Sequence, residues 1–434
     1  MSINKEFDVN QYVKFPPKLI TKFINGYYII IAQDNPNWIV LDSDEVEMFD
    51  LLKKYTIKEC LIHYKNKFNK PEQFCIDKIT TLLSKIENSD FYEDAILNKE
   101  EPMELIEKRI HINLTNNCNM RCDHCFVSAG IVERKSLDYY KLIEKVKEIQ
   151  SINGLTEVVL SGGEPLVYEH IYELLNELSD NYIVLFTNGT LINQNNYLNI
   201  CNNISEIQIS FEGVSEEVYE KIRGKGNYAK VIRAINLLKT QNIRIVLAIT
   251  ILPSTLYDVR DNLLSFIESL EYDNLEIRLN NEIEMTGNAL NLDFSNYNKL
   301  ESDKILINLM EELKNNGVTI KSSTKKNVKY TNCGIGTNIV IDYDGKIYPC
   351  NKFSSYYIPF NTEVTKLIDS FNKLNKETSC LRMKSCKSCY LKYICCGGCR
   401  IDNLKKNGDM LVTNCTEEFK NNKLKELIKD YLNG

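Results

Sequence analysis

Three cysteines stand close together in the run Cys118-Asn-Met-Arg-Cys122-Asp-His-Cys125. Three thiolates on one short loop can hold an iron–sulfur cluster and leave one iron without a protein ligand. That iron can bind a small molecule and pass an electron to it. The alternative is a zinc loop, but structural zinc sites are closed by four ligands, and no fourth ligand is nearby in the sequence. The spacing therefore favours a redox cluster.

The whole chain has 15 cysteines, and a second patterned group of them lies in its last quarter. This group reads Cys333-x11-Gly345-x4-Cys350, then Cys386-x2-Cys389-x5-Cys395-x3-Cys399, then Cys415. In a reducing compartment such patterns indicate metal sites rather than disulfides, with a zinc ribbon at 386–399 as the alternative. Five further cysteines are expected to be packing residues or surface thiols: Cys60, Cys75, Cys201, Cys380 and Cys396.

The elements that must position the first cysteine loop alternate in type over residues 105–318. Amphipathic stretches such as 138–150, 228–241 and 298–315 separate short apolar runs, which predicts repeated βα units and a parallel sheet. The predicted strands begin at Ile110, Glu157, Tyr182, Glu206, Arg244 and Leu275. Six units fall short of a closed eight-stranded barrel. We therefore expect an open, partial (β/α)6 barrel of the α/β class, with its chemistry at the C-terminal ends of the strands.

The flanking segments have different patterns. In residues 1–95, Asn25-Gly26 predicts a hairpin, and the run from Trp38 predicts a third strand. Capping-box patterns before two helices and a third helix at 72–88 complete a small winged-helix-like module. Residues 319–434 show turns and few long periodic runs, so we expect metal ligation to supply much of their order.

Four motifs together resemble the radical S-adenosylmethionine (SAM) superfamily. The first is the CxxxCxxC spacing itself. Gly162-Gly163-Glu164-Pro165 ends the second predicted strand, like the family's GGEP motif, and Thr187-Asn188-Gly189 ends the third, like its TNG motif. Ser210-Phe-Glu-Gly213 ends the fourth strand and Arg223-Gly224 follows it, similar to subfamilies that read SIDG and then RG.

This resemblance implies a [4Fe–4S] cluster on Cys118, Cys122 and Cys125 that binds SAM. It also implies the SAM-binding residues His124, Gly162, Gly163, Glu164, Asn188, Ser210 and Arg223. The edge of the strand with Glu164 would bind the amino group of methionine, Ser210 the ribose, and Arg223 the carboxylate. His124 would pack near the adenine; the alternative is a solvated loop histidine. In the family, reductive cleavage of SAM yields a 5′-deoxyadenosyl radical that abstracts hydrogen from substrate.

The later cysteines resemble the SPASM motif, which holds two auxiliary [4Fe–4S] clusters, so three clusters are expected. The resemblance assigns Cys386, Cys389, Cys395 and Cys415 to the outer cluster, and Cys333, Cys350 and Cys399 to the inner one. Fully ligated relatives have a further cysteine shortly before the Cys333 position. No cysteine lies between Cys201 and Cys333 here, so we expect an open iron or a non-cysteine ligand.

Asn351 follows Cys350, where sulfatase-maturing relatives carry an acidic base. An amide cannot act as a general base at neutral pH, which disfavours that activity.

Residues 1–95 resemble the PqqD-like element of peptide-modifying enzymes, which binds a leader peptide as an added strand. A DNA-binding winged helix and a purely structural cap are the alternatives. The segment has 12 Lys, no Arg and 15 acidic residues. This acidic balance disfavours affinity for phosphates.

We therefore expect a peptide maturase of the sactipeptide or ranthipeptide type. It would join a cysteine sulfur to a carbon of a ribosomally made precursor, with flavodoxin or ferredoxin as electron donor. Other SPASM modifications are alternatives: a carbon–carbon crosslink, epimerisation, or oxidation of a cysteine or serine as in sulfatase maturation. A redox sensor without catalytic activity is a third possibility, but it would leave the GGEP motif without a purpose.

The bulk composition limits the partners. The 434 residues carry a net charge of −6, with 43% hydrophobic residues, which is typical of a globular chain without a nucleic-acid-binding excess. No apolar run is long enough to span a bilayer, and the N-terminus lacks the apolar segment of a secretory signal. We expect a cytoplasmic protein that does not bind membranes.

Overall fold

A computed structural model describes residues 8–34, 36–93, 107–125, 133–281, 283, 285–295, 297–320, 326, 328–353 and 356–432. The chain divides into two compact units. The first contains Met1–Glu104, Ser323–Cys333 and Asn375–Gly434, and the second contains Leu105–Ser322 and Gly334–Leu374. The division into domains at 1–95, 105–318 and 319–434 stays a prediction.

The N-terminal segment of the first unit begins with a three-stranded antiparallel sheet in the order β1 (Leu19–Ile24), β2 (Tyr27–Ala32) and β3 (Asn37–Leu41). Asn25 and Gly26 join β1 to β2 with positive φ angles of 51° and 88°, as a type I′ turn requires. The predicted hairpin and third strand are confirmed.

Three helices follow: α1 (Ser43–Leu52), α2 (Ile57–Phe68) and α3 (Glu72–Asn88). Both predicted capping boxes are present, Asp42 with Glu45 before α1 and Thr56 with Glu59 before α2. One face of the sheet, with Ile30 and Ile39, packs against these helices.

The opposite face of this sheet is covered by C-terminal residues of the same unit. Ile29, Ile31, Trp38 and Val40 pack against helix α14 (Glu417–Leu432), and the Trp38 indole Nε1 donates to the carbonyl oxygen of Leu427 at 3.2 Å. The sheet is therefore buried on both faces.

The second unit is built on a ten-stranded sheet whose central six strands are parallel and adjacent in chain order. They are β4 (Arg109–Asn113), β5 (Glu157–Ser161), β6 (Tyr182–Thr187), β7 (Glu206–Ser210), β8 (Arg244–Thr250) and β9 (Leu275–Asn280). All six predicted strands are confirmed. β10 (Thr319–Ile320) extends the sheet beyond β9, and β11 (Ile339–Ile341), β12 (Lys346–Tyr348) and β13 (Ile358–Pro359) extend it beyond β4. The sheet is open, because β10 and β13 are its edges.

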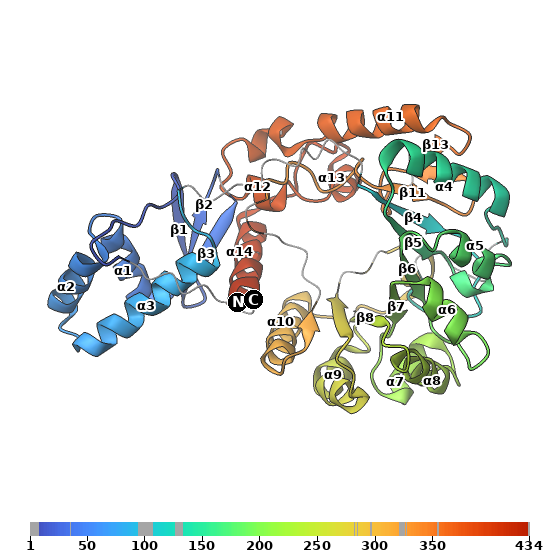
Figure 1. Ribbon diagram of the computed structural model, residues 1–434, viewed down its shortest axis with the longest axis horizontal. Coiled ribbons are helices and arrows are strands. Elements are labelled where there is room, and N and C mark those ends of the chain that lie inside the picture. The colour runs from blue at the N-terminus through green and yellow to red at the C-terminus, as the bar shows by residue number, and fades with distance from the viewer. Residues whose placement is uncertain are drawn as a thin grey trace. The chain divides into compact units, whose positions relative to one another are not determined.

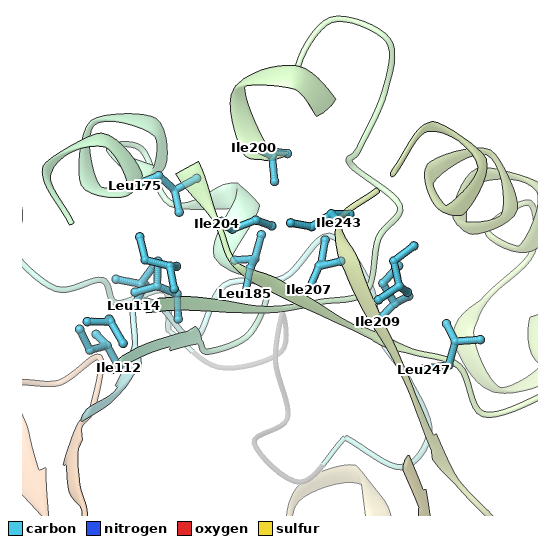
Figure 2. Packing of buried hydrophobic residues seen from close by; sticks show 14 of the residues in the cluster. Ile112, Leu114, Leu175, Leu185, Ile200, Ile204, Ile207, Ile209, Ile243 and Leu247 are labelled. Atoms are coloured by element: carbon cyan, nitrogen blue, oxygen red, sulfur yellow. The ribbon is translucent and has the colours of Figure 1, made fainter. Parts of the chain in front are cut away.

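Helices line the outer side of this curved sheet (Figure 1). They are α4 (Tyr139–Asn153), α5 (Ile171–Glu177), α6 (Tyr197–Asn203), α7 (Glu216–Arg223), α8 (Tyr228–Lys239), α9 (Leu256–Leu270) and α10 (Lys299–Asn315). Alternate strand residues such as Leu185, Ile207 and Ile209 are buried with helix residues such as Ile200 in the core (Figure 2). Because side chains alternate along a strand, the residues between them point into the concave side.

The C-terminal region differs from the expected shortage of periodic structure. It contains α11 (Val364–Glu377), the short α12 (Lys392–Cys395), α13 (Arg400–Asn407) and α14. Apolar residues of α11 and α14, such as Leu367 and Leu424, are buried in hydrophobic clusters, so hydrophobic packing contributes to the order of this region. The expected metal ligation stays a prediction. In the part of the chain that the structure describes, no helix is long and apolar enough to cross a membrane.

Candidate active site

The first cysteine loop follows β4 and is tied by hydrogen bonds to two other segments of the second unit, at Ile222 and Asn288. The backbone N–H of Asp123 donates to the Ile222 carbonyl at 3.3 Å. Asn288 donates from its backbone N–H to the Cys125 carbonyl at 2.8 Å and from Nδ2 to the Cys122 carbonyl at 3.1 Å. These bonds hold the loop at the C-terminal ends of the parallel strands, where the sequence predicts chemistry.

A cavity of about 350 Å³ lies at this edge. It is lined by nine of the predicted site residues: Cys118, Cys122, Cys125, His124, Gly162, Gly163, Asn188, Ser210 and Arg223. The tertiary structure thus brings residues from four successive βα units to one place. A cavity of this size fits a small-molecule ligand.

The three thiols fit a cluster in which iron supplies positive charge. Burial raises the pKa of the Cys118 thiol, and it raises the pKa of Cys122 to about 11. Their thiolates therefore require a cation, and iron deprotonates its cysteine ligands. Among the described residues, no three His, Cys, Asp or Glu side chains are close enough to hold one metal ion. The three thiols instead line the wall of one cavity, an arrangement that suits a multi-atom cluster.

Two glycines let β5 approach the cysteine loop. A Cβ atom on Gly163 would lie 2.3 Å from the Asn117 carbonyl oxygen, and one on Gly162 would lie 2.4 Å from that of Thr115. Gly162 also has a φ of 135°, which side-chain-bearing residues rarely adopt. The backbone at this point can therefore reach both the loop and a ligand in the cavity.

Glu164 follows the two glycines and is buried beside the cavity. Its carboxylate is fully buried and accepts hydrogen bonds from Thr187 Oγ1 at 2.6 Å and from the Asn188 backbone N–H at 2.8 Å. Glu164 is not among the residues that line the cavity. Its side chain links the ends of β5 and β6. Its contact with the amino group of SAM stays a prediction.

Asn188 connects the third motif to the cysteine loop. Its Nδ2 donates to Asn119 Oδ1 at 2.9 Å and lies 3.8 Å from the Cys118 sulfur. Its Oδ1 accepts from the Thr190 hydroxyl at 2.6 Å. The side chain is thereby oriented beside a predicted cluster ligand.

Arg223 and His124 share a buried partner that the sequence reasoning missed. The Arg223 guanidinium pairs with Glu212, and His124 Nε2 lies 3.3 Å from the other Glu212 oxygen. Burial opposes a charge on Glu212, but Arg223 and His124 outweigh it and lower its pKa to about 2. His124 is therefore a wall residue and not a solvated one. Glu212 occupies the position of Asp in the SIDG motif. This acidic position was the sequence feature from which a partner for Arg223 could have been predicted.

The opposite wall of the cavity adds polar residues that no motif indicated. Gln208 of β7, Thr250 of β8, and Arg278 and Asn280 of β9 line it, and Arg278 Nη1 donates to Gln208 Oε1 at 3.3 Å. The only feature of the sequence that could have indicated these residues is that each is a polar residue within an otherwise apolar strand.

The later cysteines are divided between the two units. Burial is the main cause of the raised pKa of Cys386, and the neighbouring thiols of Cys389 and Cys395 raise it further. The same two thiols help to raise the pKa of Cys415, and the Cys333 thiol helps to raise the pKa of Cys399. The four predicted outer-cluster ligands are thus within electrostatic reach of one another, whereas Cys350 belongs to the second unit.

The loop between Cys395 and Cys399 is held by one buried arginine. Arg400 is fully buried and donates to the carbonyl oxygens of Thr378, Cys396 and Gly398 at 2.6 to 2.7 Å. Of the cysteines outside the motifs, Cys60, Cys75, Cys380 and Cys396 are buried, which agrees with a packing role.

Similarity to known proteins covers most of the chain. The radical SAM superfamily model matches residues 112–267. A protein of Archaeoglobus fulgidus is 23% identical over 412 residues, which cover 89% of this chain and 88% of that protein. GTP 3′,8-cyclase of Alkaliphilus metalliredigens is 30% identical over 132 residues, 29% of this chain and 41% of the cyclase.

Two solved structures share the fold. SuiB of Streptococcus suis bound to S-adenosylmethionine has a TM-score of 0.57 at 17% identity, covering 93% of this chain and 99% of SuiB. AnSMEcpe with bound AdoMet and the Cp18Cys peptide has a TM-score of 0.58 at 22% identity, covering 75% of this chain and 99% of anSMEcpe. Residues 112–267 therefore match the radical SAM superfamily, in an α/β fold with a parallel sheet. The PqqD-like and SPASM assignments stay predictions.

Proposed function

We propose that this protein is a radical SAM enzyme that modifies a ribosomally made precursor peptide by forming cysteine sulfur-to-carbon thioether crosslinks. The observation that carries the proposal is the cavity that unites the three-thiol loop with Gly162, Gly163 and Ser210. Two proteins with the same fold have been solved with peptides, SuiB with its precursor SuiA and anSMEcpe with the Cp18Cys peptide.

Different residues of the cavity would bind different parts of the cluster and of SAM. Cys118, Cys122 and Cys125 would hold a [4Fe–4S] cluster, which together with SAM supplies a radical able to remove a hydrogen atom from the peptide. The backbone at Gly162 and Gly163 would meet the amino group of SAM, and Ser210 the ribose. His124 and Asn188 would complete the wall. Arg223 would face the carboxylate of SAM, with its own charge already balanced by Glu212.

The later cysteines would hold two auxiliary clusters. Cys386, Cys389, Cys395 and Cys415 would ligate the outer cluster, and Cys333, Cys350 and Cys399 the inner one. With three cysteine ligands and no further protein ligand, the inner cluster would have an open iron for the thiolate of the substrate, which would place sulfur for bond formation. A non-cysteine ligand at this iron is the alternative. The proximity of Cys389 and Cys395 to both Cys386 and Cys415, which helps to raise the pKa of these two thiols, supports the outer set.

Residues 1–95 would bind the leader of the precursor as an added strand, with β1 as the docking edge. The Gln33 N–H donates to the Lys18 carbonyl, so Lys18 is a hydrogen-bonded position of the β1–β2 pair. Because hydrogen-bonded and non-hydrogen-bonded positions alternate along an antiparallel strand, the backbone groups of Leu19, Thr21 and Phe23 face away from β2. Among the described residues, no hydrogen bond is made to these groups.

The β3 edge is closed by side chains. Asn37 Oδ1 accepts from the Trp38 N–H at 2.8 Å, and Lys85 Nζ donates to the Val40 carbonyl at 3.3 Å. An incoming strand would have to displace both bonds, which favours the open β1 edge.

The first test is SAM cleavage by the full chain after anaerobic cluster reconstitution. With SAM and a strong reductant, wild type should form 5′-deoxyadenosine, and Cys118→Ala, Cys122→Ala and Cys125→Ala should abolish its formation, because each removes a cluster ligand. Cys201→Ala is the matched control and should keep the activity. Cys333→Ala should cleave SAM but fail to crosslink. Wild type without cleavage would refute the proposal.

The second test is mass spectrometry of a candidate cysteine-containing precursor after this reaction, with thiol alkylation afterwards. A thioether removes two hydrogens and one alkylatable thiol per crosslink. Loss of two hydrogens without loss of a thiol would indicate a carbon–carbon crosslink. SAM cleavage with an unchanged peptide mass would mean that the substrate or the reaction is another one, epimerisation included. Either result would overturn the thioether assignment while retaining the enzyme class.

A further inference from the structure

Arg278 lies at the level of the predicted SAM-binding residue Ser210, two strands away. Strand register pairs Ser210 with Ala248 and Ala248 with Arg278, so the three form one row across β7, β8 and β9. The first and last of these residues, with Gln208, line the cavity. Gln208 is buried and accepts from Arg278 Nη1 at 3.3 Å, which limits the directions that the guanidinium can take.

The acidic residues around Arg278 are committed to other partners. Glu276, two residues earlier on the same face of β9, pairs with Arg244 Nη2 at 2.5 Å. Glu206 lies 3.5 Å from Arg244 Nε, and Glu212 pairs with Arg223. Among the described residues, no carboxylate lies within ion-pair distance of Arg278. Arg278 is exposed to solvent, so its guanidinium is accessible, and no described carboxylate competes with a ligand for it.

The Arg278 guanidinium donates one hydrogen bond to the Gln208 side-chain amide, and its remaining N–H groups can donate to a further acceptor. A carboxylate matches a fork of two such donors with two parallel hydrogen bonds, and the partly enclosed walls strengthen the attraction relative to open water. We propose that Arg278, oriented by Gln208, is a carboxylate-binding residue of this cavity. The inference rests on the proposed function. The carboxylate would belong either to the methionine moiety of SAM, which Arg278 would then bind together with Arg223, or to an acidic residue of the substrate peptide.

The SAM arm of the test compares two ligands that differ in the amino-acid moiety. S-adenosylhomocysteine carries the carboxylate, and 5′-methylthioadenosine lacks it together with the amino group. Calorimetric titration of the reconstituted full chain should show that Arg278→Gln binds S-adenosylhomocysteine at least about tenfold more weakly, with methylthioadenosine unchanged, if this carboxylate is the ligand. Arg278→Lys should retain part of the affinity. Arg260→Gln, on the outer helix α9, is the matched control and should bind as wild type.

The substrate arm uses protein saturated with S-adenosylhomocysteine. The probes are N-acetyl-Gly-Glu-Gly-amide and its Gln counterpart, whose binding is compared by ligand-observed NMR. If the substrate supplies the carboxylate, wild type should prefer the Glu peptide and Arg278→Gln should lose that preference. The Arg260→Gln control should keep it.

The outcomes separate the two ideas. A selective loss in the first arm identifies SAM as the source, and a selective loss in the second identifies the peptide. If Arg278→Gln changes neither, or weakens methylthioadenosine as much as S-adenosylhomocysteine, Arg278 does not bind a carboxylate and the inference is overturned. If wild type does not bind S-adenosylhomocysteine, the proposed function itself fails.

Discussion

At the scale of single residues, Glu212 determines the electrostatics of the site. One buried carboxylate serves both Arg223 of α7 and His124 of the cysteine loop, and its pKa falls to about 2. The ion pair therefore joins the wall of the cavity to the loop that would carry the cluster. Removing only one member would leave a buried charge without a partner, which is costly.

The depressed pKa of Glu212 predicts a pH-dependent contribution to stability. Because the folded value lies below the usual 4.5, the contribution is present above about pH 4.5 and is lost as the pH falls toward 2. Glu212→Gln should unfold at a lower temperature than wild type at pH 7, and this difference should shrink as the pH falls below 4.5. Thermal unfolding of both proteins from pH 7 to pH 3 measures it.

Glu216→Gln, on the exposed face of α7, is the matched control and should show neither effect. A Glu212→Gln variant whose destabilisation is constant across this pH range would contradict the ionised, paired state of Glu212.

At the scale of elements, the end of β5 and the cysteine loop are packed backbone against backbone. Gly163→Ala would place a Cβ 2.3 Å from the Asn117 carbonyl oxygen, so the loop must shift. We expect reconstituted Gly163→Ala to bind less iron at the first cluster and to bind S-adenosylhomocysteine at least about tenfold more weakly. Iron analysis and calorimetric titration check both.

Gly226→Ala separates this clash from the general effect of replacing a glycine. A Cβ on Gly226 would meet nothing within 4 Å, although its φ of 77° makes the substitution mildly strained. It should lower stability slightly and leave iron content and ligand affinity unchanged. Equal losses in both variants would remove the argument for close approach at Gly163.

At the scale of the whole molecule, the first unit joins the two ends of the chain. Helix α14 covers one face of the N-terminal sheet through Leu424, Leu427 and Ile428. The proposed leader-binding element is therefore completed by residues almost 400 positions later in the sequence. A fragment that ends at residue 95 would expose Ile29, Ile31 and Val40 to water.

Leu427→Ala tests this dependence. The side chain is fully buried, and its truncation should cost about 2 to 5 kcal/mol of the stability of the unit. Hydrogen exchange followed by mass spectrometry should show faster exchange at residues 27–41. Phe419→Ala on the same helix, where the side chain is 41% exposed, should leave exchange at 27–41 unchanged. Unchanged exchange in Leu427→Ala would show that the sheet is stable without α14.

Local patterns were sufficient for the parts of this protein that depend on neighbours in the sequence. The six parallel strands, the Asn25-Gly26 turn, the capping boxes and the radical SAM domain could all be predicted, because periodicity, turn chemistry and cysteine spacing act over a few residues. Nine of the predicted site residues line the cavity, since each motif ends a strand of one parallel sheet, whereas the polar residues of β8 and β9 in its wall were not predicted.

The tertiary structure alone decided which partner each charged group takes. Glu164 turned out to link β5 to β6, Glu212 to pair with Arg223, and α14 to cover the N-terminal sheet. Arg278 lines the cavity, whereas Glu276 of the same strand pairs with Arg244. These pairings depend on strand register and on packing between distant segments, and neither is encoded in the spacing of residues within a motif.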